Sequence, residues 1–202
     1  LKNAAISKLL NNRKYNIKYL EHISFNDKFQ YKHTQGIVIN FNGIIEKEIQ
    51  DIVSFNDNDC IIIADQIEDP QNLGQMIRSC ECAGIKGIVL PKHRSVHITN
   101  SVLQVSQGAF LHIDIYIENN LVNTINYLKK IGFWIVGVEN SIEAKKWHEI
   151  DFKGKIAIVI GSEGKGIRKL VKKSCDFLAT IPMKGKINSL NVTAALSAIL
   201  FE

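Results

Sequence analysis

Residues 156–166 read IAIVIGSEGKG, and residues 177–193 read FLATIPMKGKINSLNVT. In both stretches an apolar run typical of a buried strand passes directly into a loop rich in glycine and polar side chains. An open α/β sheet builds its ligand site at the carboxyl ends of its strands. The two loops therefore indicate one candidate pocket in the last third of the chain.

The same alternation extends back through most of the sequence. Helical patterns separate six apolar runs that are typical of strands, at residues 60–64, 87–90, 112–116, 133–138, 156–160 and 177–180. Near-continuous apolar strands that alternate with helices predict an α/β fold, with a mostly parallel sheet covered by helices on both faces. Residues 60–202 then form the principal domain.

The first part of the chain has a different pattern. A short helix is expected at residues 4–10, with strands at residues 15–19 and 36–41, but these residues are too few to make a convincing independent domain. Residues 42–59 are polar and show no strong periodicity. They are predicted to be a linker that carries one helical turn.

Composition limits the classes of function. The chain has 202 residues, 46% of them hydrophobic, with a net charge of +5 and a pI near 9.0, which favours a polyanionic partner without proving one. No apolar run approaches the ~20 residues that cross a bilayer, and no signal segment is evident, so a cytoplasmic protein is expected. Reduced structural thiols and no metal site are expected, because the cysteines match no zinc or redox spacing: Cys60, Cys80, Cys82 and Cys175.

The first helix of the principal domain follows Asp69-Pro70. Its apolar residues, from Leu73 to Ala83, recur at helical spacing and predict a buried stripe. Arg78 lies roughly 140° from Leu73 at ~100° per residue, away from this stripe. It is either a solvated arginine or a functional one, and Asn72 is either a helix cap or a site residue.

The glycine-rich turn at residues 161–166 has the pattern G-x-x-G-x-G, which is neither the dinucleotide fingerprint nor a phosphate loop. Glu163 within it would repel a phosphate and suits a hydroxyl, an amine or an arginine better. The final helix, expected at residues 189–201, is apolar nearly all round and must be buried within the domain or against a partner subunit.

Three blocks in a fixed order resemble one family. They are D-P-x-N-x-G followed by Arg78 (residues 69–78), G-x-E-G-x-G (161–166), and I-P-M with S-L-N-V (181–192). Together they look like the three motifs of the SpoU (TrmH-like) RNA ribose 2′-O-methyltransferases. Residues 92–95 and 107–109 are most similar to the branch that methylates a guanosine of 23S ribosomal RNA. Residues 33–36 resemble the end of that branch's small RNA-binding domain, which implies that residues 1–41 are a partial, small α/β N-terminal RNA-binding module.

The resemblance implies a fold, a cofactor and partners. Members of the family have a C-terminal deep trefoil knot, form homodimers and bind S-adenosyl-L-methionine. By motif, cofactor binding falls to Gly161, Ile181, Met183 and Leu190. RNA contact is expected from the basic residues near the glycine turn and the cofactor loop: Lys165, Arg168, Lys169, Lys172, Lys173, Lys184 and Lys186.

The resemblance also implies the chemistry, which is attack of a ribose 2′-oxygen on a methyl sulfonium. Arg78 would act as the base or, since a guanidinium scarcely deprotonates in proteins, as an electrostatic clamp. Asn72 and Glu163 would orient Arg78 and the ribose, and Ser189 and Asn191 would shape the substrate side. Two alternatives stay open, namely ribose methylation of transfer RNA and a non-catalytic knotted RNA-binding module.

Overall fold

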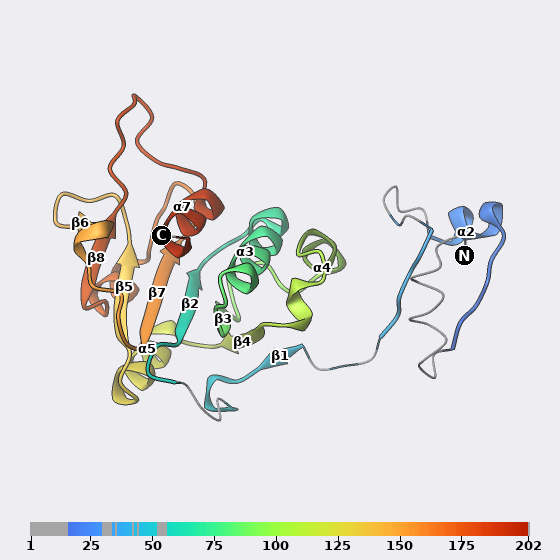
Figure 1. Ribbon diagram of the computed structural model, residues 1–202, viewed down its shortest axis with the longest axis horizontal. Helices are drawn as coiled ribbons and strands as arrows, with labels where there is room; N and C mark the ends of the chain where they lie inside the picture. Colours follow the sequence, from blue (N-terminus) through green and yellow to red (C-terminus); the bar gives the residue numbers. More distant parts are fainter. Residues whose placement is uncertain are drawn as a thin grey trace. The chain divides into compact units, whose positions relative to one another are not determined.

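The computed structural model describes residues 16–29, 34, 36–41, 43, 45–51 and 56–201. The chain divides into two units, residues 1–43 and residues 44–202, each described separately below (Figure 1).

In the first unit the described secondary structure is the helix α2 (His22–Lys28). The strands predicted at residues 15–19 and 36–41 are wrong, because residues 16–20 and 36–41 form no strand, whereas Tyr15 lies outside the described residues. Ile23 and Ile39 are 74% and 79% exposed, so their apolar spacing is not matched by burial in the described part of this unit. The helix expected at residues 4–10 also lies outside the described residues.

The second unit is built on an eight-stranded sheet in which all pairings are parallel, in the order β1-β4-β3-β2-β7-β5-β8-β6. The strands are β1 (Glu46–Lys47), β2 (Cys60–Asp65), β3 (Gly87–Pro91), β4 (Asp114–Glu118), β5 (Trp134–Val138), β6 (Lys145–Lys146), β7 (Ile156–Gly161) and β8 (Phe177–Thr180). The predicted α/β class and the six apolar strands are confirmed, although β4 begins two residues later than predicted. The predictions missed the two-residue strands β1 and β6, and β1 pairs with β4 from within the segment expected to be a linker.

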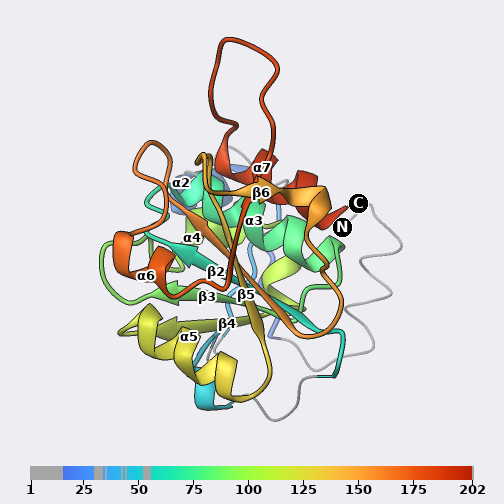
Figure 2. The same ribbon diagram turned by 90° about the vertical axis from the view of Figure 1, so that its left-hand side faces the viewer.

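Helices cover both faces of the sheet (Figures 1 and 2). One face carries α3 (Pro70–Cys82), α4 (Asn100–Val105) and α7 (Val192–Leu200), and the other carries α5 (Leu121–Lys130) and α6 (Lys169–Lys173). Side chains alternate along β2 accordingly, with Ile62 packed in one core and Ile61 in the other. Short 3₁₀ helices complete the unit: η1 (Ile49–Asp51), η2 (Ala109–Leu111) and η3 (Trp147–Glu149).

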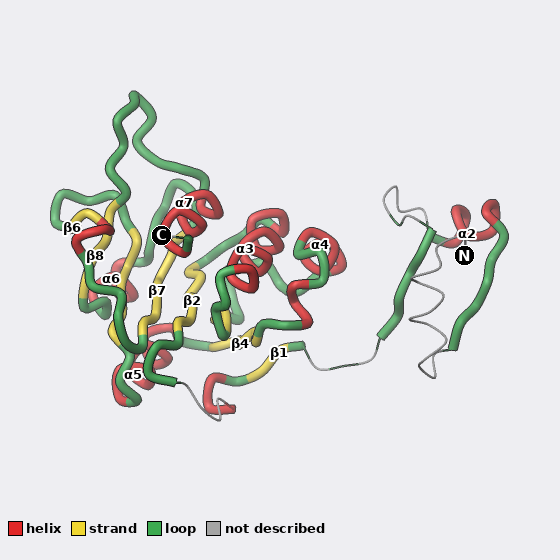
Figure 3. Tube along the Cα trace, viewed as in Figure 1, coloured by secondary structure: helices red, strands yellow, loops and turns green. Residues whose placement is uncertain are grey.

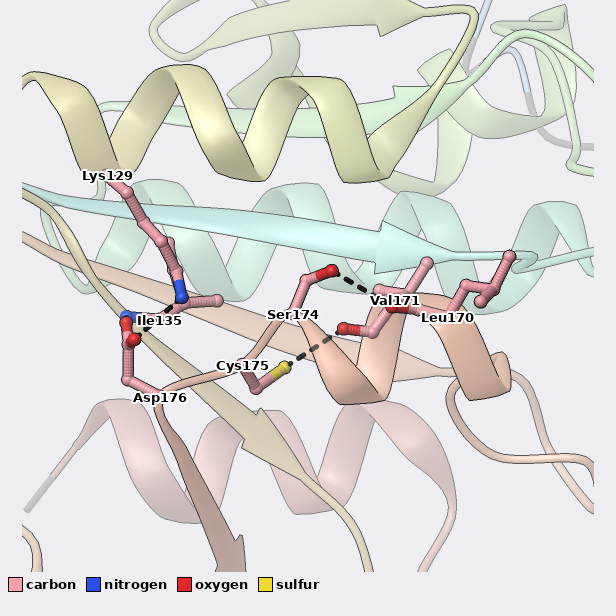
Figure 4. A network of polar contacts seen from close by, with 7 residues as sticks. All are labelled: Lys129, Ile135, Leu170, Val171, Ser174, Cys175 and Asp176. Carbon is pink, nitrogen blue, oxygen red and sulfur yellow. Dashed lines mark hydrogen bonds and ion pairs between the residues drawn. The ribbon is translucent and has the colours of Figure 1, made fainter.

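The amino ends of β5 and β8 are fastened by Asp176 (Figure 4). Its carboxylate accepts hydrogen bonds from the Lys129 Nζ of α5 at 2.6 Å and from the Ile135 backbone N–H at 2.9 Å. The Asp176 backbone N–H donates in turn to the Ile135 carbonyl oxygen at 2.8 Å. Helix α5 and strands β5 and β8 are therefore held together at this edge.

The carboxyl ends of β2, β5, β7 and β8 meet at the opposite edge, because the sheet is parallel. From β8 the chain continues as residues 181–191, which extend from the sheet as an exposed loop before α7 (Figures 2 and 3). Helix α7 begins at Val192 rather than at the predicted Ser189, because the Asn191 side chain caps it by accepting from the Thr193 backbone N–H.

Two expectations concern the unit as a whole. The trefoil knot implied by the resemblance stays a prediction. Within the described part of the chain, none of the helices has both the length and the apolar character that crossing a membrane requires.

Candidate functional site

Three polar side chains from distant parts of the sequence meet at the carboxyl edge of the sheet. Asn72 Nδ2 donates to Glu163 Oε1 at 3.1 Å, and Asn191 Nδ2 donates to Asn72 Oδ1 at 3.1 Å. Asn191 Nδ2 also donates to Glu163 Oε1. The three motifs found in the sequence therefore each contribute one side chain to a single hydrogen-bonded cluster.

Each member of this Asn72–Glu163–Asn191 cluster is positioned by its own element. Asp69 caps α3 by accepting from the Gln71 backbone N–H at 2.9 Å, so Asn72 is not the helix cap and its amide is available to Glu163. Asn191 caps α7, and Thr193 Oγ1 donates to Gln75 Oε1 at 3.1 Å, which ties α7 to α3. The cluster thus lies where the two helices begin.

The glycine turn that carries Glu163 is sharply folded. A bridge pairs Ser162 with Gly166, and a Cβ atom at Gly161 would lie 2.1 Å from the Gly166 carbonyl carbon. Gly164 and Gly166 have φ angles of 79° and 66°, the left-handed region that glycine adopts without strain. Glycine at position 161 is therefore required for the turn to close.

The end of the turn is anchored by Asp65, at the end of β2. Its carboxylate is fully buried and accepts from the Arg168 backbone N–H at 2.8 Å and from Arg168 Nε at 2.7 Å. A buried carboxylate needs such partners, because an unpaired charge in the interior is costly. Asp65 therefore fixes the path of the chain after the glycine turn.

A cavity of about 870 Å³ opens beside the turn. Its walls include all four residues to which the resemblance assigns cofactor binding, namely Gly161, Ile181, Met183 and Leu190. Ser189 and Asn191, predicted on the substrate side, line it as well. The volume lies within the range of roughly 300–1,000 Å³ that is usual for small-molecule and cofactor sites.

A smaller cleft of about 200 Å³ adjoins this cavity. Both are lined by Ser162, Glu163, Lys165 and Val192, and the cleft also reaches Asn72. Glu163 and its partner Asn72 therefore lie at the junction of the two cavities, where a molecule in the large cavity would contact a second molecule in the cleft.

Arg78 lies outside this cluster. It is exposed on α3, whereas the predicted stripe on the same helix is fully buried from Leu73 to Cys80 and only its last member, Ala83, is half-buried. Neither of the two cavities has Arg78 in its lining, and within the described residues Arg78 takes part in no ion pair. Its assignment to substrate stays a prediction.

The predicted basic surface separates into two groups. Arg168 is paired with Asp65, and Lys172 Nζ donates to Glu139 Oε1 at 2.8 Å, so both side chains serve the loops of the site. The hydrogen bond to Glu139 raises the pKa of Lys172. The side chains that remain exposed are Lys165, Lys169, Lys173, Lys184 and Lys186.

Two polar atoms in the large cavity have no partner. Glu139 Oε2 and Ser162 Oγ are buried and make no hydrogen bond to any described residue. Buried polar groups are almost always satisfied in folded proteins, so a cavity lined by an unpaired carboxylate oxygen and an unpaired hydroxyl fits a ligand that carries hydroxyl or amino groups. S-adenosylmethionine is such a ligand. Among the described residues, no group of three or more His, Cys, Asp or Glu side chains is arranged to hold a metal ion.

Sequence reasoning missed Asp65, Glu139 and Ser162 as site residues. Asp65 is the last residue of β2 and Glu139 directly follows β5, and a polar residue at the carboxyl end of a strand is the available signal. Their partners, however, lie 103 and 33 residues away in the sequence, which no local pattern reveals.

The chain matches known proteins over the part that contains the three motifs. Residues 59–201 match the family described as the SpoU rRNA Methylase family. The chain is 44% identical over 142 residues to a protein of Staphylococcus saprophyticus named as a TrmH-family tRNA/rRNA methyltransferase, covering 70% of this chain and 57% of that protein. A Bacillus subtilis protein of the same description is 38% identical over 172 residues, covering 83% of this chain and 69% of the relative. The chain thus spans a little over half to about two thirds of these relatives.

The fold of the chain is also similar to that of a solved methyltransferase structure. The rRNA methyltransferase of Sinorhizobium meliloti, crystallised with bound S-adenosylmethionine, aligns with a TM-score of 0.68 at 25% identity, over 72% of this chain and 56% of that one.

Proposed function

The chain belongs to the SpoU rRNA methylase family, whose members use S-adenosylmethionine, and we propose that it transfers a methyl group from this cofactor to a ribose 2′-oxygen of RNA. The preferred substrate is a guanosine of 23S ribosomal RNA. One observation carries the proposal, namely the Asn72–Glu163–Asn191 cluster at the junction of a cofactor-sized cavity and a second, smaller cleft.

Gly161, Ile181, Met183 and Leu190 would hold the cofactor in the large cavity. When bound, it would supply an electrophilic methyl group on a sulfonium. The remaining work falls to the chain's own residues, which must orient the ribose and exclude water.

Glu163 would orient the ribose. Both asparagine amides donate to its Oε1, and within the described residues its Oε2 takes part in no hydrogen bond. Oε2 can therefore accept a hydrogen bond from a 2′-hydroxyl in the cleft, while Asn72 and Asn191 fix the plane of the carboxylate. In the transfer, the bond between sulfur and the methyl carbon would break as the ribose oxygen gains the methyl group, which would leave S-adenosylhomocysteine. The hydroxyl proton would leave to water or to a base.

Arg78 would act on the substrate as an electrostatic clamp. Its guanidinium can bind a phosphate through two parallel hydrogen bonds, and its positive charge would favour the ionised form of a nearby hydroxyl. Arg78→Ala should abolish methyl transfer while leaving cofactor affinity nearly intact, and Arg78→Lys should rescue poorly because an ammonium lacks the planar fork. Near wild-type turnover of Arg78→Ala would remove Arg78 from the mechanism.

The substrate is tested with labelled S-adenosylmethionine on unmodified 23S ribosomal RNA and on unmodified transfer RNA, followed by mapping of 2′-O-methylated nucleotides. Methylation of a 23S guanosine supports the proposal, and methylation of transfer RNA alone would move the substrate to the other class. Cofactor binding without transfer to either RNA would favour a non-catalytic RNA-binding module. A parallel arm with chelator tests whether metal is needed.

The assembly proposed is a homodimer through α7. Ala194 and Ala198 are exposed on this apolar helix, and Phe201 just beyond it is 60% exposed. Ala198→Glu should convert a dimer into a folded monomer, measured by sedimentation and circular dichroism. A wild-type protein that is monomeric at high concentration would contradict the assembly.

The trefoil knot is also proposed for the C-terminal segment. Residues 181–191 are held from two sides by loops that precede them in the chain, through Asn140 Nδ2 to the Asn188 carbonyl oxygen at 2.6 Å and through Asn191 to Glu163. An experimental structure that traces the chain from β5 to α7 without a break tests the threading.

A further inference from the structure

Glu139 follows β5 and lines the large cavity. Its backbone N–H donates to the Ala179 carbonyl oxygen of β8 at 2.9 Å, so the residue is fixed to the sheet. The carboxyl carbon also lies close to the glycine turn, since a Cβ atom at Gly166 would be 3.9 Å from it. The side chain is thus held between a strand end and the turn that carries Glu163.

The two carboxylate oxygens of Glu139 have different surroundings. Oε1 accepts from Lys172 Nζ at 2.8 Å. Oε2 is buried and accepts no hydrogen bond from any described residue. A buried acceptor left unsatisfied costs free energy that a bound donor would recover.

The charge of Glu139 is already balanced. Its ion pair with Lys172 is partly buried, with the two side chains 23% and 27% exposed, respectively. A carboxylate that is neutralised in this way has less attraction left for a second cation, but it keeps a lone pair for a neutral donor. A hydroxyl therefore fits Oε2 better than an ammonium group does.

Resting on the function proposed above, we propose that Glu139 is a cofactor-binding residue whose Oε2 accepts a hydrogen bond from a ribose hydroxyl of S-adenosylmethionine. The position of Glu139 between the end of β5 and the glycine turn places this contact in the cavity that Gly161 and Ile181 also line. Glu139 belongs to none of the three sequence motifs, so this contact would lie outside the residues to which the motifs assign cofactor binding.

Binding of S-adenosylhomocysteine, measured by titration calorimetry, tests the contact with two matched variants. Glu139→Met removes both the ion pair and the acceptor at similar side-chain length. Lys172→Met removes the same ion pair but leaves Oε2 in place. Glu139→Met should weaken binding about 10-fold, and Lys172→Met by less than about 3-fold. Equal weakening by the two variants would overturn the direct contact, because the ion pair alone would then explain the loss.

Ligand analogues identify the group that Glu139 contacts. The analogues are the 2′-deoxy and 3′-deoxy forms of S-adenosylhomocysteine, each of which lacks one ribose hydroxyl. The wild-type protein should bind the analogue that lacks the contacted hydroxyl about as weakly as Glu139→Met binds S-adenosylhomocysteine itself. Glu139→Met should lose little further affinity with that same analogue. If instead the effect of Glu139→Met disappears with 5′-methylthioadenosine, which lacks the amino-acid part, the contact is to the ammonium and the ribose assignment is wrong.

Unfolding midpoints of the ligand-free variants serve as the folding control, since both variants lose the same ion pair and should shift alike. The outcomes also separate the two levels of proposal. A wild-type protein that binds no S-adenosylhomocysteine would overturn the cofactor assignment itself. Wild-type binding with an unchanged affinity in Glu139→Met would overturn only the role of Glu139.

Discussion

The carboxylates at the amino edge and the carboxyl edge of the sheet differ in how completely they are hydrogen-bonded. At the amino edge, Asp176 uses both oxygens, one for Lys129 Nζ and one for the Ile135 backbone N–H. At the carboxyl edge, Glu139 uses one oxygen and leaves the other buried without a partner among the described residues. The first edge satisfies its own polar groups, whereas the second leaves acceptors that a ligand can fill.

The difference shows how one scaffold can be stable and still bind ligands. At the amino edge, both carboxylate oxygens of Asp176 have a partner within the fold, and these contacts contribute stability. The carboxyl edge forgoes some of that stability, as expected where a site is built for another molecule. Variants at the two edges should therefore separate loss of function from loss of stability.

The largest effect is expected from Asn191→Ser. Serine keeps an oxygen that caps α7 but removes the amide that donates to Asn72 and Glu163. Methyl transfer should fall by about 100-fold or more, while the free energy of unfolding changes by less than ~0.5 kcal/mol. Turnover with labelled cofactor and chemical denaturation measure the two quantities. A fall in turnover that is fully explained by a loss of folding stability would mean that Asn191 serves only as a helix cap.

Asp65→Asn should have the next largest effect, on stability. The substitution removes a fully buried charge that accepts two hydrogen bonds from Arg168, itself 38% exposed. Unfolding should become easier by about 2 kcal/mol. Glu149→Gln is the control, because its pair with Lys146 is exposed and should contribute less than ~1 kcal/mol. Similar values for the two variants would contradict the role assigned to Asp65.

Asp176→Ala should lower stability without changing ligand affinity. It removes the contacts that join α5, β5 and β8 at the amino edge (Figure 4). A loss of about 1–2 kcal/mol is expected. The affinity for S-adenosylhomocysteine should stay within about 2-fold of wild type, which is ~0.4 kcal/mol. A larger change in affinity would show that the two edges are coupled.

The smallest effect concerns pH. Burial raises the pKa of Cys175, next to Asp176, from 9.0 to about 12. The unfolded chain therefore loses the Cys175 thiol proton near pH 9, while the folded protein keeps it. The contribution of the Cys175 thiol to the free energy of unfolding is complete below pH 9 and declines as pH rises toward 12. Cys175→Ala should reduce the loss of stability between pH 8 and pH 10 by about 1 kcal/mol. Exposed Cys82→Ala should leave that loss unchanged, and denaturation at the two pH values compares them.

Sequence periodicity predicted the central strands well, because β2, β3 and β7 are buried on both faces and consist almost entirely of apolar residues. It missed β1 and β6, which are two charged, exposed residues each and carry no apolar signal. In the first unit, apolar spacing was mistaken for strands although residues such as Ile39 are exposed.

The candidate site was predicted unevenly. Motif residues such as Asn72 and Asn191 could be found, because each lies in a recognisable local pattern. The roles of Asp65 and Glu139 could not, because they depend on ion pairs with α6 and the segment before it, which only the folded chain brings close. Residues that belong to a local motif can be found in the sequence, whereas residues whose roles depend on ion pairs between distant segments cannot.

The three residues of the Asn72–Glu163–Asn191 cluster lie far apart along the chain, which determines when the cluster can form during folding. Glu163 lies 91 residues after Asn72, and Asn191 follows 28 residues later, from the beginning of the last helix. A folding intermediate with a complete sheet but an undocked α7 would have no assembled cluster. During refolding, recovery of methyl transfer should therefore lag behind recovery of sheet structure and report the final step of folding.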